Sequence, residues 1–188
     1  MRLAILLVGQ LRFPNEDYFN KFFSFINKYD IYISSYQSYE NIARLMTDKN
    51  KYILHDPDQI SFRSGNMYQW FHLCTLLKTF DFDKYDVLLK LRTDVKIDEL
   101  KDEHFINLRN NTLYLHTDWT FYAETNYFIH LFYNYIELVN TIYYDRDDEY
   151  IPIKYDNILK SCNESKPFIQ WTWLVVPKII ATQNWKQF

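Results

Sequence analysis

The residues best suited to chemistry follow a strongly apolar stretch in the middle of the chain. Residues 86–92 read Asp-Val-Leu-Leu-Lys-Leu-Arg, and Thr93 and Asp94 come next. An arginine can pair with a phosphate, and an aspartate carboxylate suits a hard divalent cation such as Mg²⁺ or Mn²⁺. A cation held by Asp94 can bridge to a diphosphate, while Arg92 either contacts the nucleotide or pairs with a neighbouring carboxylate. The sequence leaves both interpretations of Arg92 open.

A second candidate group follows the apolar run at residues 3–8. It reads Gly9-Gln10-Leu11-Arg12. Gly9 lets the backbone turn closely past a ligand, because glycine tolerates conformations that other residues avoid. Gln10 can recognise a base or a ribose, and Arg12 can pair with a phosphate. The alternative is an ordinary tight turn with a solvated arginine.

Aromatic and acidic residues follow two further apolar runs. Tyr36 comes after the second run and can stack on a base, or it is an ordinary tyrosine at the rim of a site. Asp118 comes after the run at 112–116 and is a candidate second metal ligand or a carboxylate that binds the acceptor. Trp119 or Tyr122 can stack on a sugar face. Glu124 is a candidate general base.

Short apolar runs alternate with segments of helical periodicity, and the strands and helices that they predict must position the candidate residues. It predicts an α/β fold, one Rossmann-like domain over residues 1–188, with a mostly parallel central sheet and helices on both faces. In such sheets, ligands bind beyond the carboxyl ends of the strands, where the candidate residues are expected. The predicted strands are 3–8, 30–35, 52–55, 86–92, 112–116 and 168–176. The predicted helices are 14–26, 37–47, 66–80, 128–139 and 153–163, and a short helix with a loop is expected within 98–110.

Composition excludes several classes of protein. The 188 residues carry 21 Lys and Arg against 24 Asp and Glu, so a net charge of −3 argues against broad nucleic-acid binding. With only two glycines there is no GxGxxG and no Walker A sequence, which removes P-loop NTPases and typical dinucleotide dehydrogenases. No apolar run reaches the ~20 residues of a membrane span, and a soluble, cytoplasmic protein of unknown oligomeric state is expected. Four histidines lack the spacing of metal ligands and are expected on the surface or in the core: His55, His72, His104 and His130.

Several motifs together resemble those of GT-A-like glycosyltransferases of polysaccharide biosynthesis. Residues 9–12 resemble the "GQxR" segment of these enzymes, and residues 67–70, Met-Tyr-Gln-Trp, fit the pattern of the helix that comes next. Residues 85–95 resemble their "YDxxxxxRxDV" segment, and residues 115–121 resemble the "D-x-x-F" segment that follows it. The motifs occur in the same order and span roughly residues 3–140.

The resemblance implies a nucleotide-sugar donor, a divalent metal (Mn²⁺ or Mg²⁺) and a glycan or glycolipid acceptor. In that family the last aspartate of a DxD motif binds the metal under the diphosphate, and Asp94 matches this position. Arg92 stands where the first acid is expected, so an arginine can supply part of the charge neutralisation. If the reaction inverts the anomeric centre, Asp118 or Glu124 is the candidate base.

Two alternatives stay open. The first is a non-catalytic, degenerate transferase-like module that binds a sugar or a protein, because the first acid of the DxD motif is missing. The second is a metal-dependent nuclease built on Asp86, Asp94 and Lys96. The spacing argues against it, because Asp86 and Asp94 stand at opposite ends of one predicted strand, about 25 Å apart at ~3.3 Å per residue.

Overall fold

The computed structural model describes residues 1–60, 65–94, 96–97, 100–106, 108–116, 120–134 and 179–180. Its strands are β1 (Leu3–Val8), β2 (Asp30–Tyr36), β3 (Tyr52–His55), β4 (Val87–Leu91), β5 (Lys96–Ile97), β6 (Tyr114–His116), β7 (Thr120–Glu124) and β8 (Ile179–Ile180). Its α-helices are α1 (Glu16–Ile26), α2 (Glu40–Met46), α3 (Gly65–Thr79) and α4 (Thr125–Phe132). Short 3₁₀ turns occupy Gln37–Tyr39, Lys49–Lys51, Pro57–Gln59 and Asp102–Phe105.

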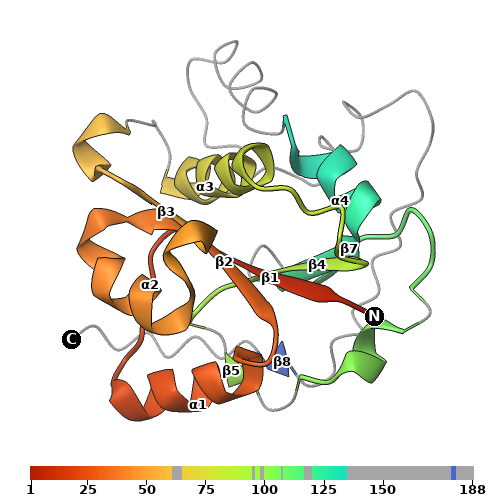
Figure 1. The fold of residues 1–188 in the computed structure, drawn as a ribbon, viewed down its shortest axis with the longest axis horizontal. Coiled ribbons are helices and arrows are strands. Elements are labelled where there is room, and N and C mark those ends of the chain that lie inside the picture. The colour runs from red at the N-terminus through yellow and green to blue at the C-terminus, as the bar shows by residue number, and fades with distance from the viewer. Residues whose placement is uncertain are drawn as a thin grey trace.

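The central sheet has six strands in the order β3-β2-β1-β4-β7-β6 (Figure 1). The pairings of β3 with β2, β2 with β1 and β1 with β4 are parallel. Strand β7 runs antiparallel to both β4 and β6, so the other five strands share one direction. The prediction of a mostly parallel sheet is therefore confirmed.

Each face of the sheet carries its own apolar core. Along β1, Ala4, Leu6 and Val8 belong to a core with α3 and α4, while the alternate residues belong to a second core with α1 and α2. Figure 1 shows the two pairs of helices on opposite faces. All six residues of β1 are buried, because a parallel strand covered on both faces has no solvent side. The run at 3–8 was thus predictable from its continuous apolar character.

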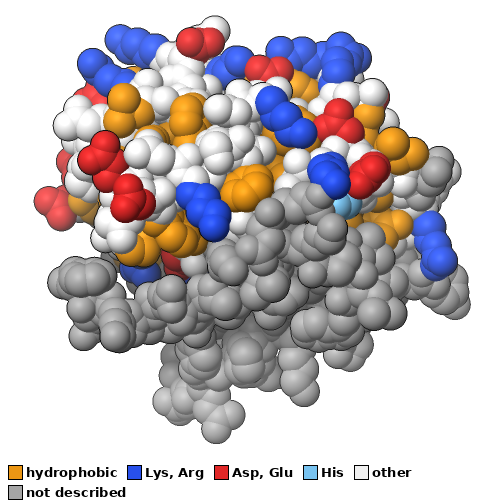
Figure 2. Space-filling model, turned by 90° about the horizontal axis from the view of Figure 1, so that it is seen from below, with side chains coloured by type: hydrophobic (Ala, Val, Ile, Leu, Met, Phe, Trp, Pro, Cys, Tyr) orange, Lys and Arg blue, Asp and Glu red, His pale blue; other side chains and the backbone are white. Residues whose placement is uncertain are grey.

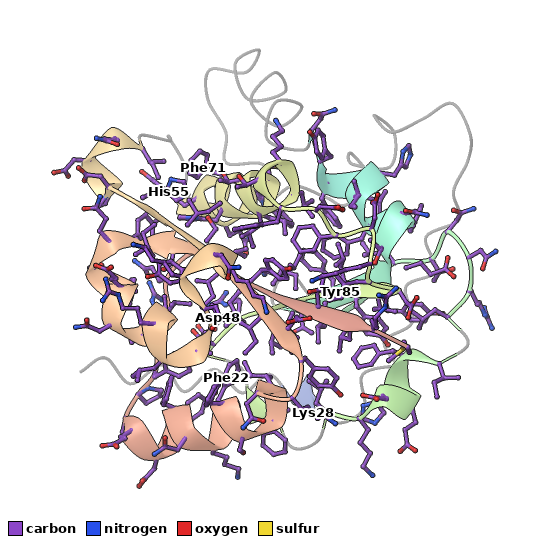
Figure 3. The ribbon with its side chains drawn as sticks, viewed as in Figure 1. Phe22, Lys28, Asp48, His55, Phe71 and Tyr85 are labelled. Atoms are coloured by element: carbon purple, nitrogen blue, oxygen red, sulfur yellow. The ribbon has the colours of Figure 1, made fainter. Side chains whose placement is uncertain are left out.

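The first helix begins where its sequence predicts. The Asn15 side chain accepts a hydrogen bond from the backbone N–H of Tyr18 at 2.8 Å, which satisfies one of the orphan donors of the first turn. Phe22 and Ile26 are buried, and Figure 3 shows Phe22 pointing from α1 towards the sheet. The helix therefore packs through the apolar stripe seen in the sequence.

The sequence did not predict every element. Strand β7 was not foreseen, and neither was the pairing of β5 with β8, which form a separate two-stranded sheet. The helix predicted over 128–139 begins earlier, at Thr125, and its last residues lie outside the described part of the chain, as do the elements predicted at 153–163 and 168–176. None of the helices in the described ranges combines the length and apolar composition needed to cross a bilayer.

Candidate functional site

The two loops singled out by the sequence lie side by side at the carboxyl edge of the sheet. Strands β1 and β4 pair in parallel, with Leu7 opposite Leu91, so both end at the same edge. The backbone N–H of Arg12 donates to Thr93 Oγ1 at 2.9 Å, and the Thr93 side chain is buried. One hydrogen bond therefore joins the loop after β1 to the loop after β4.

The backbone angle at position 9 favours a glycine. Its φ of +82° lies in the region that favours glycine, and a Cβ built there would meet nothing within 4 Å. Its N–H donates to the Ser34 carbonyl at 2.9 Å, and its own carbonyl accepts from Ser35 Oγ at 2.6 Å. The turn after β1 is thus fixed to the end of β2, and the space beside Gly9 is open.

Arg92 and Asp94 form a two-pronged ion pair. Arg92 Nε donates to Asp94 Oδ1 at 2.7 Å, and Arg92 Nη2 donates to Asp94 Oδ2. The side chains are 24% and 29% exposed, so solvent reaches both. The structure therefore shows the pairing that the sequence left open as one of two interpretations of Arg92.

The metal expected at Asp94 stays a prediction. Each carboxylate oxygen of Asp94 accepts one hydrogen bond from Arg92 and keeps a second lone pair, so a cation can share the carboxylate with the guanidinium. Within the described ranges, no group of three His, Cys, Asp or Glu side chains is placed to hold a metal ion. We derive no step through a metal at Asp94.

Two tyrosines border the loops. Burial and the charge of Asp94 raise the pKa of Tyr18 to about 12, so its phenol stays protonated beside that carboxylate. Tyr36 ends β2 and is half-buried, and its ring meets the edge of His72 at a centroid distance of 4.8 Å. Gln10 and Arg12 are exposed at the same edge. Six candidate residues therefore lie at the carboxyl edge of the sheet, because each ends or follows β1, β2 or β4. They are Gly9, Gln10, Arg12, Tyr36, Arg92 and Asp94.

A buried polar cluster lies beneath this edge, against α3. Ser34 Oγ lies 2.8 Å from His72 Nδ1 and 3.2 Å from His55 Nε2. Burial lowers the pKa of His72 to about 3, with a smaller contribution from His55, and burial also lowers the pKa of His55. Both imidazoles are therefore neutral at pH 7. Figure 3 shows His55 beside Phe71, and their rings are 5.0 Å apart.

Lys90 is a second feature that sequence reasoning missed. It lies in the middle of the sheet and is fully buried, and its Nζ is 3.2 Å from Gln69 Oε1 of α3 and 5.1 Å from the centre of the Phe121 ring. The signal was present in the sequence, since a lysine inside the run Val-Leu-Leu-Lys-Leu interrupts a strand buried on both faces. Thr93 and Ser34 had no comparable signal, because their importance comes from contacts with distant loops.

Two candidates of the following segment lie away from the carboxyl edge or inside the core. Glu124 pairs with Val87 across β4 and β7, which places it at the amino edge of the sheet, away from Asp94. Tyr122 is buried and stacks on Tyr114 at 5.0 Å with an angle of 6° between the rings, so it is not placed to stack on a sugar. Both positions follow from β7, because its antiparallel direction places its carboxyl end at the amino edge of the sheet.

Asp118 and Trp119 lie outside the described residues. The strands on either side of them end at His116 and begin at Thr120, and these two residues pair with each other. Thr120 also pairs with Leu91, the last residue of β4. The described flanks of this segment therefore lie at the carboxyl edge of the sheet.

Charges of both signs are mixed over the surface seen in Figure 2. Lysine and arginine side chains alternate with aspartate and glutamate over the described residues of that face, without a broad basic stripe. This agrees with the net charge of −3.

Comparison with known proteins shows which solved structures have a similar fold. No model of a protein family matches the chain, and no curated protein matches it in sequence. In structure it is similar to the apo-form glycosyltransferase GlyE of Streptococcus pneumoniae TIGR4, with a TM-score of 0.51 and 12% identity over 90% of this chain and 44% of that one. A glycosyltransferase involved in the glycosylation of the major capsid of PBCV-1 gives a TM-score of 0.49 and 12% identity over 91% of this chain and 82% of that one. This chain thus spans less than half of GlyE, and it has the Rossmann-like, GT-A-like α/β fold that its sequence predicted.

Proposed function

We propose that this chain transfers a sugar from a nucleotide-sugar donor to a glycan or glycolipid acceptor. The observation that carries the proposal is the hydrogen bond from Arg12 to Thr93, because it brings the loops of Arg12 and Arg92 together at the ligand-binding edge of the sheet. The fold shared with GlyE supports the same class of reaction. Because the chain spans 44% of GlyE, the activity of the complete protein is part of the proposal.

The chemistry asked of this edge is stabilisation of a leaving group. Sugar transfer breaks the bond between the anomeric carbon and the nucleoside diphosphate, and negative charge builds on the departing phosphate oxygen. Guanidinium groups fixed in place before the reaction stabilise that charge as it develops. Arg12 and Arg92 are the candidates for this role, while Gln10 and Tyr36 are candidates to recognise the base or the ribose.

The acceptor side of the reaction is assigned to the segment between β6 and β7. An inverting transfer needs a carboxylate that takes the proton of the acceptor hydroxyl. Asp118 is our candidate, since β7, the strand that follows it, begins opposite the end of β4 at the carboxyl edge, and β6, the strand that precedes it, ends opposite the start of β7. Glu124 is not part of the proposal, because it lies at the opposite edge.

A nucleotide panel tests the proposal. Thermal unfolding is measured with UDP, GDP, CDP and CMP, and with the matching nucleosides as controls that lack phosphate. A ligand at 100 times its Kd adds about 2.7 kcal/mol to the free energy of unfolding, which is readily measured. We expect one nucleotide to stabilise the chain and its nucleoside to have a much smaller effect.

Matched variants connect the result to the site. Arg12→Gln should weaken the nucleotide effect, whereas Arg44→Gln should not, because Arg44 pairs with Glu40 on α2, outside the two loops. The corresponding nucleotide sugars are then assayed for release of the nucleoside diphosphate. Release supports a transferase, and binding without release supports the non-catalytic module. If no nucleotide stabilises the chain, the donor site is assigned wrongly.

A further inference from the structure

We infer that His72 is a positioning residue of the nucleotide site, because it holds Tyr36, the ring proposed to recognise the base, from inside the molecule. The inference rests on the proposed function and adds to its donor site a residue that does not touch the donor. It concerns how the base is held and not how the diphosphate is neutralised.

Tyr36 ends β2 beside the turn where the nucleotide is proposed to lie. Side chains alternate along a strand, so Ser34 and Tyr36 share the face of β2 that α3 covers. The Ser34 carbonyl accepts the N–H of Gly9 at 2.9 Å, and the space beside Gly9 is open. A half-buried aromatic ring therefore stands next to open space at the carboxyl edge of the sheet.

His72 supports this ring from α3. Its side chain has no exposed surface, and its ring lies perpendicular to that of Tyr36, with centroids 4.8 Å apart and 86° between the planes. His72 Nδ1 lies 2.8 Å from Ser34 Oγ, which fixes the rotation of the imidazole. The ring of His55 packs against the imidazole at 5.1 Å. Tyr36 thus rests on a ring that is itself bonded to the strand from which Tyr36 comes.

The fold can spare the hydrogen bond between His72 and Ser34. Both histidines are neutral at pH 7, because burial lowers the pKa of each imidazole. A hydroxyl donates one proton and also accepts, so Ser34 can donate to one ring nitrogen and accept an N–H from the other. Without His72, Ser34 Oγ still has His55 Nε2 at 3.2 Å. Loss of the imidazole should therefore affect the site more than the fold.

The other nitrogen of His72 argues against a role in packing alone. Nε2 is buried and has no hydrogen-bond partner among the described residues. A buried polar atom without a partner costs free energy, and an apolar side chain would avoid that cost. The imidazole suits a position that needs both a flat ring against Tyr36 and a hydrogen bond to Ser34.

Nucleotide affinity in variants of the two rings tests the inference. The Kd of the nucleoside diphosphate identified above is measured by calorimetry at neutral pH. Tyr36→Ala should raise the Kd about tenfold or more, since the stacking of a base on an aromatic ring is of that size. His72→Leu should raise it about threefold to tenfold, because Tyr36 remains but loses its support. His72→Phe keeps a ring beside Tyr36 and loses only the bond to Ser34, so it should recover part of the affinity.

Double variants show whether His72 acts through Tyr36. In Tyr36→Ala, the further change His72→Leu should raise the Kd by less than about twofold, because the ring that His72 supports is gone. Arg92→Gln removes a guanidinium proposed for the phosphate, and its loss should multiply with that of His72→Leu, since β1 separates β4 from β2. His130→Leu replaces an exposed histidine and should leave the Kd unchanged. The unfolding temperature of every ligand-free variant is measured in parallel, and if His72→Leu does not fold, the same double variants are built with His72→Phe.

The outcomes separate this inference from the proposed function. If the loss in the His72 variant disappears in Tyr36→Ala and multiplies with that of Arg92→Gln, the inference is supported. If neither Tyr36→Ala nor the His72 variant changes the Kd, or if their losses multiply, it is overturned while the transferase proposal stands. If no nucleotide binds the unaltered chain, the proposed function itself fails, and the inference falls with it.

Discussion

The two edges of the central sheet use their polar residues in different ways. At the amino edge, Asp30 accepts hydrogen bonds from Lys51 at 2.6 Å and from Tyr85 at 2.8 Å, and the Tyr85 hydroxyl lies 3.1 Å from that of Tyr32. These partners are 21 to 55 residues apart in sequence. At the carboxyl edge, Arg92 pairs with Asp94, only two residues away.

The difference in sequence separation decides what each pair does for the fold. At the amino edge, Asp30 joins segments that are distant in sequence, and several such bonds form one network. At the carboxyl edge, the charged pair of Arg92 with Asp94 lies within one loop and joins no distant segments. The single long-range bond described there is the one between Arg12 and Thr93, which are 81 residues apart.

The largest expected effect on stability is that of low pH, and the groups at the two edges respond to it in different pH ranges. His72 has a pKa of about 3 in the folded chain against an ordinary value of 6.5. Below pH 6.5 the unfolded chain therefore binds a proton at this residue that the folded chain does not bind. This single group should lower the free energy of unfolding by about 2 kcal/mol between pH 7 and pH 5. The pKa of Asp30 is lowered by its bond to Lys51, so its contribution is present above pH 3.8 and is lost only below it.

Denaturant unfolding of His72→Gln measures this effect. The variant should lose most of the dependence on pH between 6.5 and 5, because the group that resists protonation is gone. His130→Gln is the matched control, since His130 is exposed. An unchanged slope in His72→Gln would show that the buried cluster at Ser34 does not govern acid stability.

The second largest effect on stability is expected at the amino edge. Tyr85→Phe removes the hydroxyl that lies between Asp30 and Tyr32. It should lower the free energy of unfolding by about 1–2 kcal/mol, because a hydrogen bond to a charged group is lost and the buried Tyr32 hydroxyl loses a partner. Nucleotide affinity should stay the same, because Tyr85 precedes β4 at the far end from Arg92. Tyr133→Phe at an exposed site is the control. A loss of affinity equal to that of Arg92→Gln would contradict the separation of the two edges.

At the carboxyl edge, Gly9→Ala should cost about 1 kcal/mol. The cost is conformational, because a side chain at φ +82° is strained although nothing lies within 4 Å of the new Cβ. Gly9→Asn should cost less, since asparagine adopts positive φ more readily than alanine does. Chemical denaturation of both variants checks the order. If alanine and asparagine destabilise equally, the backbone angle is not the reason for glycine at this position.

The fold was largely predictable from sequence, because burial on both faces leaves a clear pattern. Strands β1 and β3 begin and end where their apolar runs do, and α3 follows its helical stripe. Strand β7 is hard to predict, because Phe121 and Tyr122 lie next to the candidate site residues Asp118 and Trp119. A sequence pattern reports burial but not strand direction, so the far-edge position of Glu124 could not be predicted.

The site was predictable only to the level of its loops. The rule that ligands lie beyond the carboxyl ends of parallel strands brought Gly9, Arg12, Arg92 and Asp94 to one edge, as the structure has them. The pairing of Arg92 with Asp94 depends on side-chain rotamers, which the sequence does not specify. The buried contact of Ser34 with His55 and His72 depends on the packing of α3 over β2, which becomes known only with the fold.

The smallest expected effect on stability is also the sharpest test of the comparison. Thr93→Val keeps the shape of the side chain but removes the acceptor of the Arg12 N–H, and it should cost less than about 1 kcal/mol, because Arg12 is exposed and water can replace the bond. Nucleotide affinity should fall severalfold, since the loop with Gly9 and Arg12 is no longer held against Arg92. Thr93→Ser keeps the hydroxyl and should restore both properties. Should Thr93→Val instead destabilise the folded chain as much as Tyr85→Phe does while leaving affinity intact, the carboxyl edge would be as structural as the amino edge, and the distinction between them would fail.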